Sequence, residues 1–102
     1  AIFGNEDKNT VTGQVTDDHG FPLEHVFVFP EPIGKTGGPI PEIAVYTNRN
    51  GCFVWHVPPG RYQFRFQKAS YQTTYSVVKA DANKVVRIRI KMKKEKKTAQ
   101  PS

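Results

Sequence analysis

Residues 58–67 read PPGRYQFRFQ, and this stretch decides the fold class. Pro58-Pro59-Gly60 interrupts any regular element, because proline lacks a backbone N–H and glycine permits a sharp change of direction. Polar and aromatic residues then alternate without a break from residue 61 to residue 67. A period of two is the pattern of a β-strand with one buried face. We therefore predict a strand that points Tyr62, Phe64 and Phe66 into a core.

Six further segments carry strand signals, with turn residues between them. They cover residues 10–16, 25–29, 43–47, 52–57, 73–78 and 85–92. In the last segment, alternation directs the side chains of Val86, Ile88, Ile90 and Met92 inward. No stretch shows the 3.6-residue hydrophobic period of a helix. Seven short strands in a chain of this size predict an all-β fold, a seven-stranded antiparallel Greek-key β-sandwich.

The two ends of the chain lack this alternation. We expect residues 1–9 to form a flexible leader, residues 10–92 a single β-sandwich domain, and residues 93–102 a basic disordered tail. No run of apolar residues is long enough to predict a transmembrane helix. The first residue is Ala1 rather than methionine, which fits either a removed leader or a piece cut from a longer protein.

Residues 30–41 (PEPIGKTGGPIP) interrupt the strand pattern with four prolines and three glycines. Proline removes hydrogen-bond donors from a sheet, and glycine weakens extended pairing. The composition predicts a long loop over residues 30–42, between the second and third strands. Loops of this length are uncommon unless they are functional or mobile, although a surface insertion without function is the alternative that the sequence leaves open.

Several short motifs follow one another in an order that resembles a known family. A Gly-x-Val strand leads into an Asp/Gly turn and a Pro-Leu step, and a Pro-Gly-x-Tyr step comes later. This order resembles the carboxypeptidase regulatory-like domains, which are transthyretin-like (prealbumin-like) sandwiches. The matching residues are Gly13, Val15, Asp17 to Gly20, Pro22, Leu23, Val26, Val28, Thr47, Gly51, Phe53, Pro58 to Gly60, Tyr62 and Tyr71.

The resemblance implies a non-catalytic accessory or interaction module, since domains of this family commonly accompany peptidases, surface proteins and transporters. It also implies an extracytoplasmic location, periplasmic or secreted. Two features depart from the family pattern. Ser70 precedes Tyr71 where the family often has glycine, so this turn is open to a different shape. The basic tail after Met92 is not part of the pattern.

Enzyme and metal sites of related sandwiches require residues that this sequence lacks. Transthyretin-like hydrolases of the purine pathway end in Tyr-Arg-Gly-Ser, and this chain does not. Intradiol dioxygenases need a His-x-His pair after the Pro-Gly-x-Tyr step, and no histidine follows His56. Cys52 and His56 are only weak candidates for a copper site, because four residue steps along an extended strand separate them by about 13 Å. We expect no enzymatic activity, no cofactor and no metal.

Charge is unevenly distributed along the sequence, although the net charge is only +6. Residues 1–50 contain three basic and seven acidic residues, whereas residues 51–102 contain twelve basic and two acidic residues. If the fifth and seventh strands share a sheet, their outward cations form one basic face for an anionic polymer or glycan. The aromatic residues point to the opposite side, which argues against single-stranded nucleic acid. The cations are Arg61, Arg65, Arg87, Arg89 and Lys91.

The strand before the proline-rich loop is apolar on both faces. If Val26 and Val28 face the core, Phe27 and Phe29 point away from it. Either the loop covers these two rings or they form an exposed apolar patch for a partner. The leading hypothesis is a module that binds a partner protein through the 30–42 loop and the Phe27/Phe29 surface. An anion- or carbohydrate-binding module that uses the basic face is second, and a small metal-binding protein is third.

Overall fold

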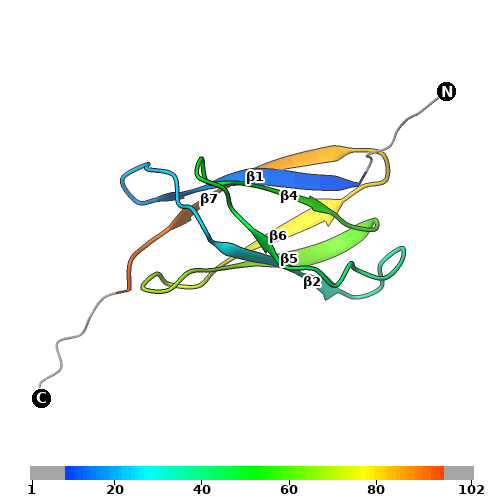
Figure 1. Cartoon of the computed structure of the whole chain (residues 1–102). Helices are drawn as coiled ribbons and strands as arrows, with labels where there is room; N and C mark the ends of the chain where they lie inside the picture. Colours follow the sequence, from blue (N-terminus) through cyan, green and yellow to red (C-terminus); the bar gives the residue numbers. More distant parts are fainter. Residues whose placement is uncertain (1–8, 96–102) are drawn as a thin grey trace, which may run out of the picture.

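The computed structural model describes residues 9–95, which fold into two β-sheets packed face to face (Figure 1). One sheet has the strand order β4-β1-β7 and the other has the order β3-β2-β5-β6. The predicted all-β sandwich is thus confirmed. The strands are β1 (Thr10–Asp17), β2 (Phe27–Ile33), β3 (Val45–Tyr46), β4 (Cys52–His56), β5 (Gly60–Gln67), β6 (Thr74–Ala80) and β7 (Val85–Met92). Between Asn9 and Glu95 no helix has the length and hydropathy that a membrane crossing needs.

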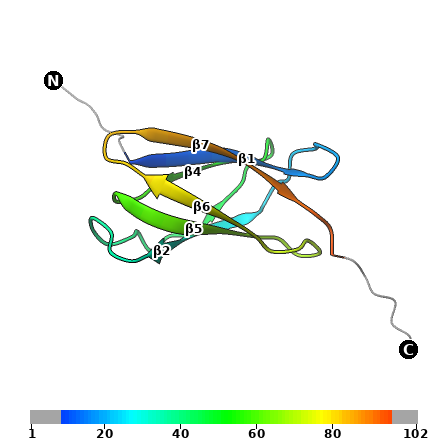
Figure 2. The same cartoon turned by 180° about the vertical axis from the view of Figure 1, so that it is seen from behind.

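One strand pair differs from the predicted antiparallel arrangement, because β1 and β7 are parallel. The chain passes from β6 in one sheet to β7 in the other through a short turn, visible at one end of the sandwich in Figure 2. The same turn is bonded to the start of β1: the Thr10 N–H donates to the Lys84 carbonyl, and the Asn83 N–H donates to Asn9 Oδ1. Both strands therefore start at this end and run in the same direction.

The core is built from the strand faces that the sequence pattern predicted. Tyr62, Phe64 and Phe66 of β5 have no exposed surface. Phe53 of β4 crosses from the opposite sheet, with its ring 5.6 Å from that of Phe66 and 6.4 Å from that of Phe64. Aromatic pairs at these separations stabilise a core beyond the effect of the area that they bury. Trp55 is also buried, and its indole N–H donates to the Val28 carbonyl at 2.9 Å.

The predicted end of strand β2 is wrong, because the sequence pattern ended the strand at Phe29 and began a loop at Pro30. The structure continues β2 to Ile33, through Pro30 and Pro32. Strand β3 pairs only with Phe27 and Val28, so the rest of β2 has β5 on one side and no strand on the other. N–H groups alternate in direction along a strand, and both prolines can place their nitrogens toward the open side. The prolines therefore cost β2 no hydrogen bonds to β5.

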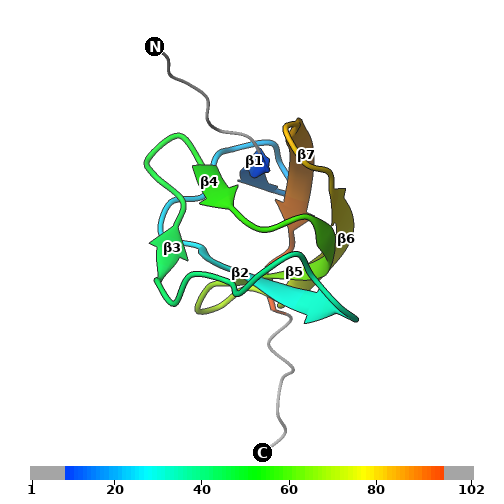
Figure 3. The same cartoon turned by 90° about the vertical axis from the view of Figure 1, so that its right-hand side faces the viewer.

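The loop is consequently shorter than predicted and begins at Gly34. It crosses the end of the sandwich, where the Gly37 N–H donates to the Pro59 carbonyl at 2.8 Å, and Ile40 packs against the core (Figure 3). The third strand was predicted over residues 43–47 but contains only Val45 and Tyr46. The loop thus packs against the β4–β5 turn, where Gly37 and Gly38 lie beside Pro59 and Pro58.

Candidate binding surfaces

The outer face of the four-stranded sheet carries apolar side chains on both sides of strand β5, whose outward residues are polar. Strand register places Tyr46 opposite Phe27, and Arg65 opposite both Phe29 and Tyr75. Tyr46, Tyr75 and Val77 are 54%, 53% and 61% exposed. We refer to this surface as the outer aromatic face; it consists of Phe27, Phe29, Tyr46, Tyr75 and Val77.

Phe27 and Phe29 project from β2 as expected, but both rings are half-buried. The two rings stack with 6.3 Å between their centroids. Tyr46 lies 5.5 Å from Phe27, and the ring of Phe29 meets Trp55 edge-on at 6.4 Å. The sequence offered two alternatives, rings covered by the loop or rings in an exposed patch, and the structure lies between them: Tyr46 and Trp55 shield part of Phe27 and Phe29, and the remainder of each ring is exposed.

Arg65 lies across the middle of this face. Its guanidinium carbon is 5.4 Å from the centroid of the Phe29 ring, a cation–π contact. The same guanidinium forms an ion pair with Glu31, and its Nε donates to the Gln67 side-chain oxygen at 2.9 Å. Gln63 donates to the second oxygen of Glu31 at 3.3 Å. The positive charge of Arg65, at the centre of the outer aromatic face, is therefore paired with the carboxylate of Glu31 on the same face.

The predicted single basic face is wrong, because β5 and β7 belong to different sheets. Arg61 and Arg65 lie on the four-stranded sheet, and Arg65 is paired with Glu31. The β7 cations share a separate face, the outer side of the three-stranded sheet. We call Arg87, Arg89 and Lys91 the basic strip.

Strand β1, which pairs with β7, places polar side chains beside the basic strip. Parallel pairing places Arg87 beside Thr12 and Arg89 beside Gln14. These four side chains, together with Cys52, border a shallow hollow above Gly13. Gly13 itself faces the core: a Cβ there would lie 2.4 Å from the Ile88 carbonyl oxygen and 3.0 Å from the buried Phe53 ring, so the packing beneath the hollow requires glycine at this position.

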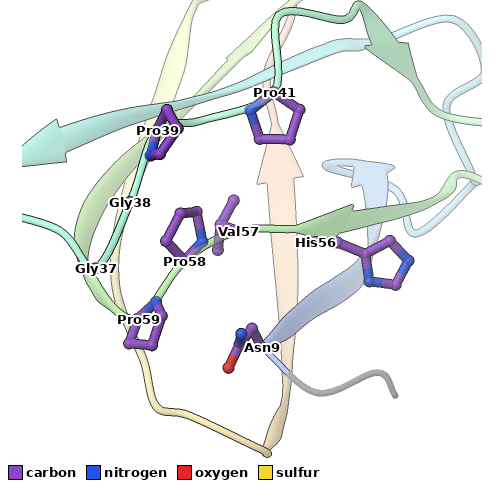
Figure 4. Close-up of a pocket in the computed structure, with 9 residues that line it drawn as sticks. All are labelled: Asn9, Gly37, Gly38, Pro39, Pro41, His56, Val57, Pro58 and Pro59. Atoms are coloured by element: carbon purple, nitrogen blue, oxygen red, sulfur yellow. The ribbon is translucent and has the colours of Figure 1, made fainter. Parts of the chain in front are cut away.

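A second hollow lies at the end of the sandwich, between the loop and the β4–β5 turn. Figure 4 shows its prolines on two separate segments, Pro39 and Pro41 on the loop and Pro58 and Pro59 after β4. Hydrogen bonds fix both walls, from Gly37 to the Pro59 carbonyl and from the Tyr62 hydroxyl to the Pro58 carbonyl. Asn9 and His56 form its polar side. Sequence reasoning missed this hollow, because the contact between the loop and the turn is not encoded in any local motif.

The family model of the carboxypeptidase regulatory-like domain matches residues 10–93. The chain belongs to this family. No curated protein sequence matches the chain. Similar solved structures include a streptococcal ancillary pilin, at 20% identity and a TM-score of 0.67 over 85% of this chain and 32% of that chain. The chain thus spans about a third of that pilin.

Two further structures share the fold at low identity. GBS52, a minor pilin of Streptococcus agalactiae, is 18% identical with a TM-score of 0.64, over 93% of this chain and 48% of that chain. The 3-chlorocatechol 1,2-dioxygenase of Rhodococcus opacus 1CP is 15% identical with a TM-score of 0.62, over 89% of this chain and 62% of that chain. At these identities the likeness concerns the fold alone.

One of these similar structures is a dioxygenase, so the positions of the histidines in this chain bear on whether it could hold a metal. The three histidines of the sequence lie apart: His19 follows β1, His25 precedes β2 and His56 ends β4. His19 and His25 lie 3.7 Å from the neighbouring carboxylates Asp18 and Glu24, and His56 Nδ1 lies 3.2 Å from Thr10 Oγ1. All three are exposed.

Cys52 and His56, the weak metal candidates, lie at opposite ends of β4, opposite Gln14 and Thr10 of β1. Within residues 9–95, no three His, Cys, Asp or Glu side chains gather closely enough to hold a metal ion.

The family motif at Tyr71 has a structural explanation. Ser70 adopts a φ of 74°, in the left-handed region that glycine favours. The family often has glycine at this position, and the positive φ of Ser70 is a conformation that glycine adopts without strain. Tyr71 is half-buried against the core, and its N–H donates to the Lys68 carbonyl at 3.0 Å.

Proposed function

We propose that the chain is a non-catalytic interaction module that binds a partner protein through the outer aromatic face and the adjoining segment over residues 30–42, of which the part after Ile33 forms the loop. The observation that carries the proposal is the exposure of Tyr46, Tyr75 and Val77 on the same sheet face as Phe27 and Phe29, with Arg65 of β5 between the two groups. Large apolar side chains gathered on one side of a sheet mark interaction surfaces, whereas scattered ones do not.

The chemistry of this face suits a protein partner. Tyrosine and phenylalanine are enriched at the centres of protein interfaces, because they bury a large area and lose few side-chain rotamers. A buried unpaired charge would oppose binding. Arg65 is already paired with Glu31, so a partner that covers the face does not have to neutralise it.

Ile33 connects the outer aromatic face to the loop. It is the last residue of β2 and is 40% exposed, and the loop begins at the next residue. A partner that lies along β2 would contact both elements. Family membership and the likeness to pilins support an interaction role and an extracytoplasmic location.

Paired variants on the two sheets test the proposal. Tyr75→Ser/Val77→Ser removes the most exposed part of the outer aromatic face without touching the core. Val54→Ser/Val85→Ser is the matched control, because both valines are 49% exposed on the opposite sheet. Proteins retained by each immobilised variant are quantified, and the binding of retained partners is then measured directly in titrations with purified components.

The proposal predicts that the control retains the wild-type partners and that Tyr75→Ser/Val77→Ser loses them. Binding should change little between low and high salt, because the contact is apolar. Ile33→Ser should weaken binding further if the loop side takes part. Equal retention by all variants would exclude the outer aromatic face as the binding surface.

A further inference from the structure

We propose that the basic strip and the hollow beside it form a second binding site, for a linear anionic polysaccharide. The site lies on the outer side of the three-stranded sheet, opposite the outer aromatic face. It consists of Arg87, Arg89 and Lys91 on β7, with Thr12 and Gln14 on β1.

The cations are unpaired with acids on their own sheet. Strands β1, β4 and β7 contain a single acidic residue, Asp17, at the end of β1. Its carboxylate accepts the N–H groups of His19 and Phe21 at 2.8 and 2.9 Å, and the bond from Phe21 contributes most to a lowered pKa. The Asp17 carboxylate is thus hydrogen-bonded within its own turn. The positive charge of the basic strip is therefore not neutralised by an acidic residue of its own sheet, and it attracts anions.

The spacing of the cations suits a repeating anion. Alternate residues of a strand lie about 6.8 Å apart, so the three cationic positions extend over about 13 Å in a straight line. All three side chains are exposed. A linear polymer that lies along β7 can contact each of them in turn, whereas a single small anion can contact only one or two.

The floor of the hollow selects among anionic polymers. Thr12 donates its hydroxyl proton to the Phe53 carbonyl at 2.7 Å, and Gln14 donates its amide N–H to the Asn50 carbonyl at 2.9 Å. The Thr12 hydroxyl proton and one Gln14 amide N–H are used in these bonds, so the Thr12 oxygen and the Gln14 side-chain oxygen are left as acceptors. Acceptors beside guanidinium donors suit a ligand that carries hydroxyl groups as well as negative charge. Polysaccharides have both, and the backbone of single-stranded DNA has no hydroxyl donor.

Aromatic side chains are missing from the strand faces that surround the hollow. Proteins that bind single-stranded nucleic acid usually stack its bases on aromatic rings. The aromatic residues of β4, Phe53 and Trp55, are buried in the core. This contrast favours a polysaccharide over a nucleic acid.

The test uses the whole chain and four probes: a sulfated heparin oligosaccharide, an oligogalacturonate, neutral dextran and oligothymidine. We expect the two anionic oligosaccharides to bind, with an affinity that falls as salt is raised. Displacement of about one counterion by each of three cations gives a slope of about 2–3 in a plot of log Kd against log salt. Neutral dextran should not bind, and oligothymidine should bind more weakly than the heparin oligosaccharide.

Two triple variants, each of which removes three positive charges, distinguish binding at this site from general electrostatic attraction to a basic protein. Arg87→Ser/Arg89→Ser/Lys91→Ser should weaken binding at least about tenfold. Lys35→Ser/Arg61→Ser/Lys79→Ser removes three exposed cations elsewhere and should change Kd less than about threefold. Thr12→Val and Gln14→Leu should weaken binding of the oligosaccharides but not that of oligothymidine.

Cys52 supplies a local readout, because it borders the hollow and is the only cysteine of the chain. Alkylation of its thiol by iodoacetamide should slow when either anionic oligosaccharide is bound and should not respond to dextran. Equal loss of affinity in both triple variants, unchanged alkylation on binding, or tighter binding of oligothymidine than of the oligosaccharides would each overturn the proposal.

Discussion

The Tyr62 hydroxyl donates a hydrogen bond to the carbonyl oxygen of Pro58, four residues earlier in the chain, at 2.5 Å. The bond closes the Pro58-Pro59-Gly60 turn onto the first core residue of β5. The ring of Tyr62 is fully buried, and only its hydroxyl reaches the rim of the core. The sequence predicted a buried ring at this position, and the bond shows how the turn and the strand are joined.

Tyr62→Phe should lower the free energy of unfolding by about 0.5–1.5 kcal/mol, because it removes this hydrogen bond and leaves the ring in place. In a domain of this size the melting temperature falls by about 4–8 °C for each kcal/mol. Urea unfolding and thermal melting measure the change. Tyr75→Phe is the control, since its exposed hydroxyl has no such partner, and the proposed role of the bond is refuted if the two variants lose equal stability.

Tyr62 also predicts how stability changes at alkaline pH. Burial raises its pKa above the ordinary value of 10.0. The folded state then holds the phenol proton more tightly than the unfolded chain does, so this contribution is complete below pH 10 and is lost as the pH rises above it. Unfolding of the wild type should become easier above pH 10, and Tyr62→Phe should show a smaller pH dependence. Parallel pH profiles of the two proteins would contradict the prediction.

The side chain of buried Thr47 forms hydrogen bonds with two backbone groups that are not paired within either sheet. Its hydroxyl donates to the Leu23 carbonyl at 2.6 Å and accepts the Val26 N–H at 2.9 Å. Thr47→Val has nearly the same shape but leaves both groups unsatisfied, at about 1–3 kcal/mol for each. Thr47→Ser keeps the hydroxyl and should lose much less. Denaturant unfolding of both variants gives the comparison, and a serine variant as unstable as the valine variant would show that the methyl group, rather than the hydrogen bonds, matters here.

Strand faces could be predicted from the sequence because alternation is a local property. Residues 61–67 and 85–92 contain their own evidence for which side chains point inward, and the structure confirms it. The same reasoning located Phe27 and Phe29 on the outside of β2.

Sheet membership could not be predicted in this way, since it depends on which strands pair over long distances in the chain. The sequence therefore combined Arg61 and Arg65 with the β7 cations, although the two sets lie on opposite sheets. Tyr75 and Val77 were not recognised as part of the candidate site, because only the pairing of β5 with β6 brings them beside Arg65 and Gln63, respectively. The prolines also caused the end of β2 to be predicted too early. A proline whose nitrogen faces the unpaired edge of a strand is compatible with hydrogen bonding on the other edge.

Gly51 and Gly20 both have positive φ values, 76° and 89°, but differ in their surroundings. A Cβ on Gly51 would lie 2.4 Å from the Val15 carbonyl oxygen, whereas nothing lies within 4 Å of a Cβ on Gly20. Both alanine variants should lose about 1–2 kcal/mol from backbone strain. Gly51→Ala should lose a further ~1–3 kcal/mol from the steric clash. Equal losses in urea unfolding would show that the Gly51 site relaxes around the added carbon.

Ser70 offers a stabilising change at the turn where this chain departs from its family. Its φ of 74° is unfavourable for any residue with a Cβ. Its carbonyl accepts the Glu95 N–H at 2.9 Å, which holds the turn in this conformation. Ser70→Gly relieves the strain but gives the unfolded chain more freedom, so we expect a net gain of up to about 1 kcal/mol.

The neighbouring residue supplies the control for this change. Ala69 is exposed in the same turn and does not have a positive φ, so Ala69→Gly adds only unfolded-state freedom and should lose about 0.5–1 kcal/mol. Thermal and urea unfolding of the two variants should therefore move in opposite directions from the wild type. If Ser70→Gly is destabilised as much as Ala69→Gly, the left-handed conformation of Ser70 carries no strain, and the frequent glycine of the family needs another cause.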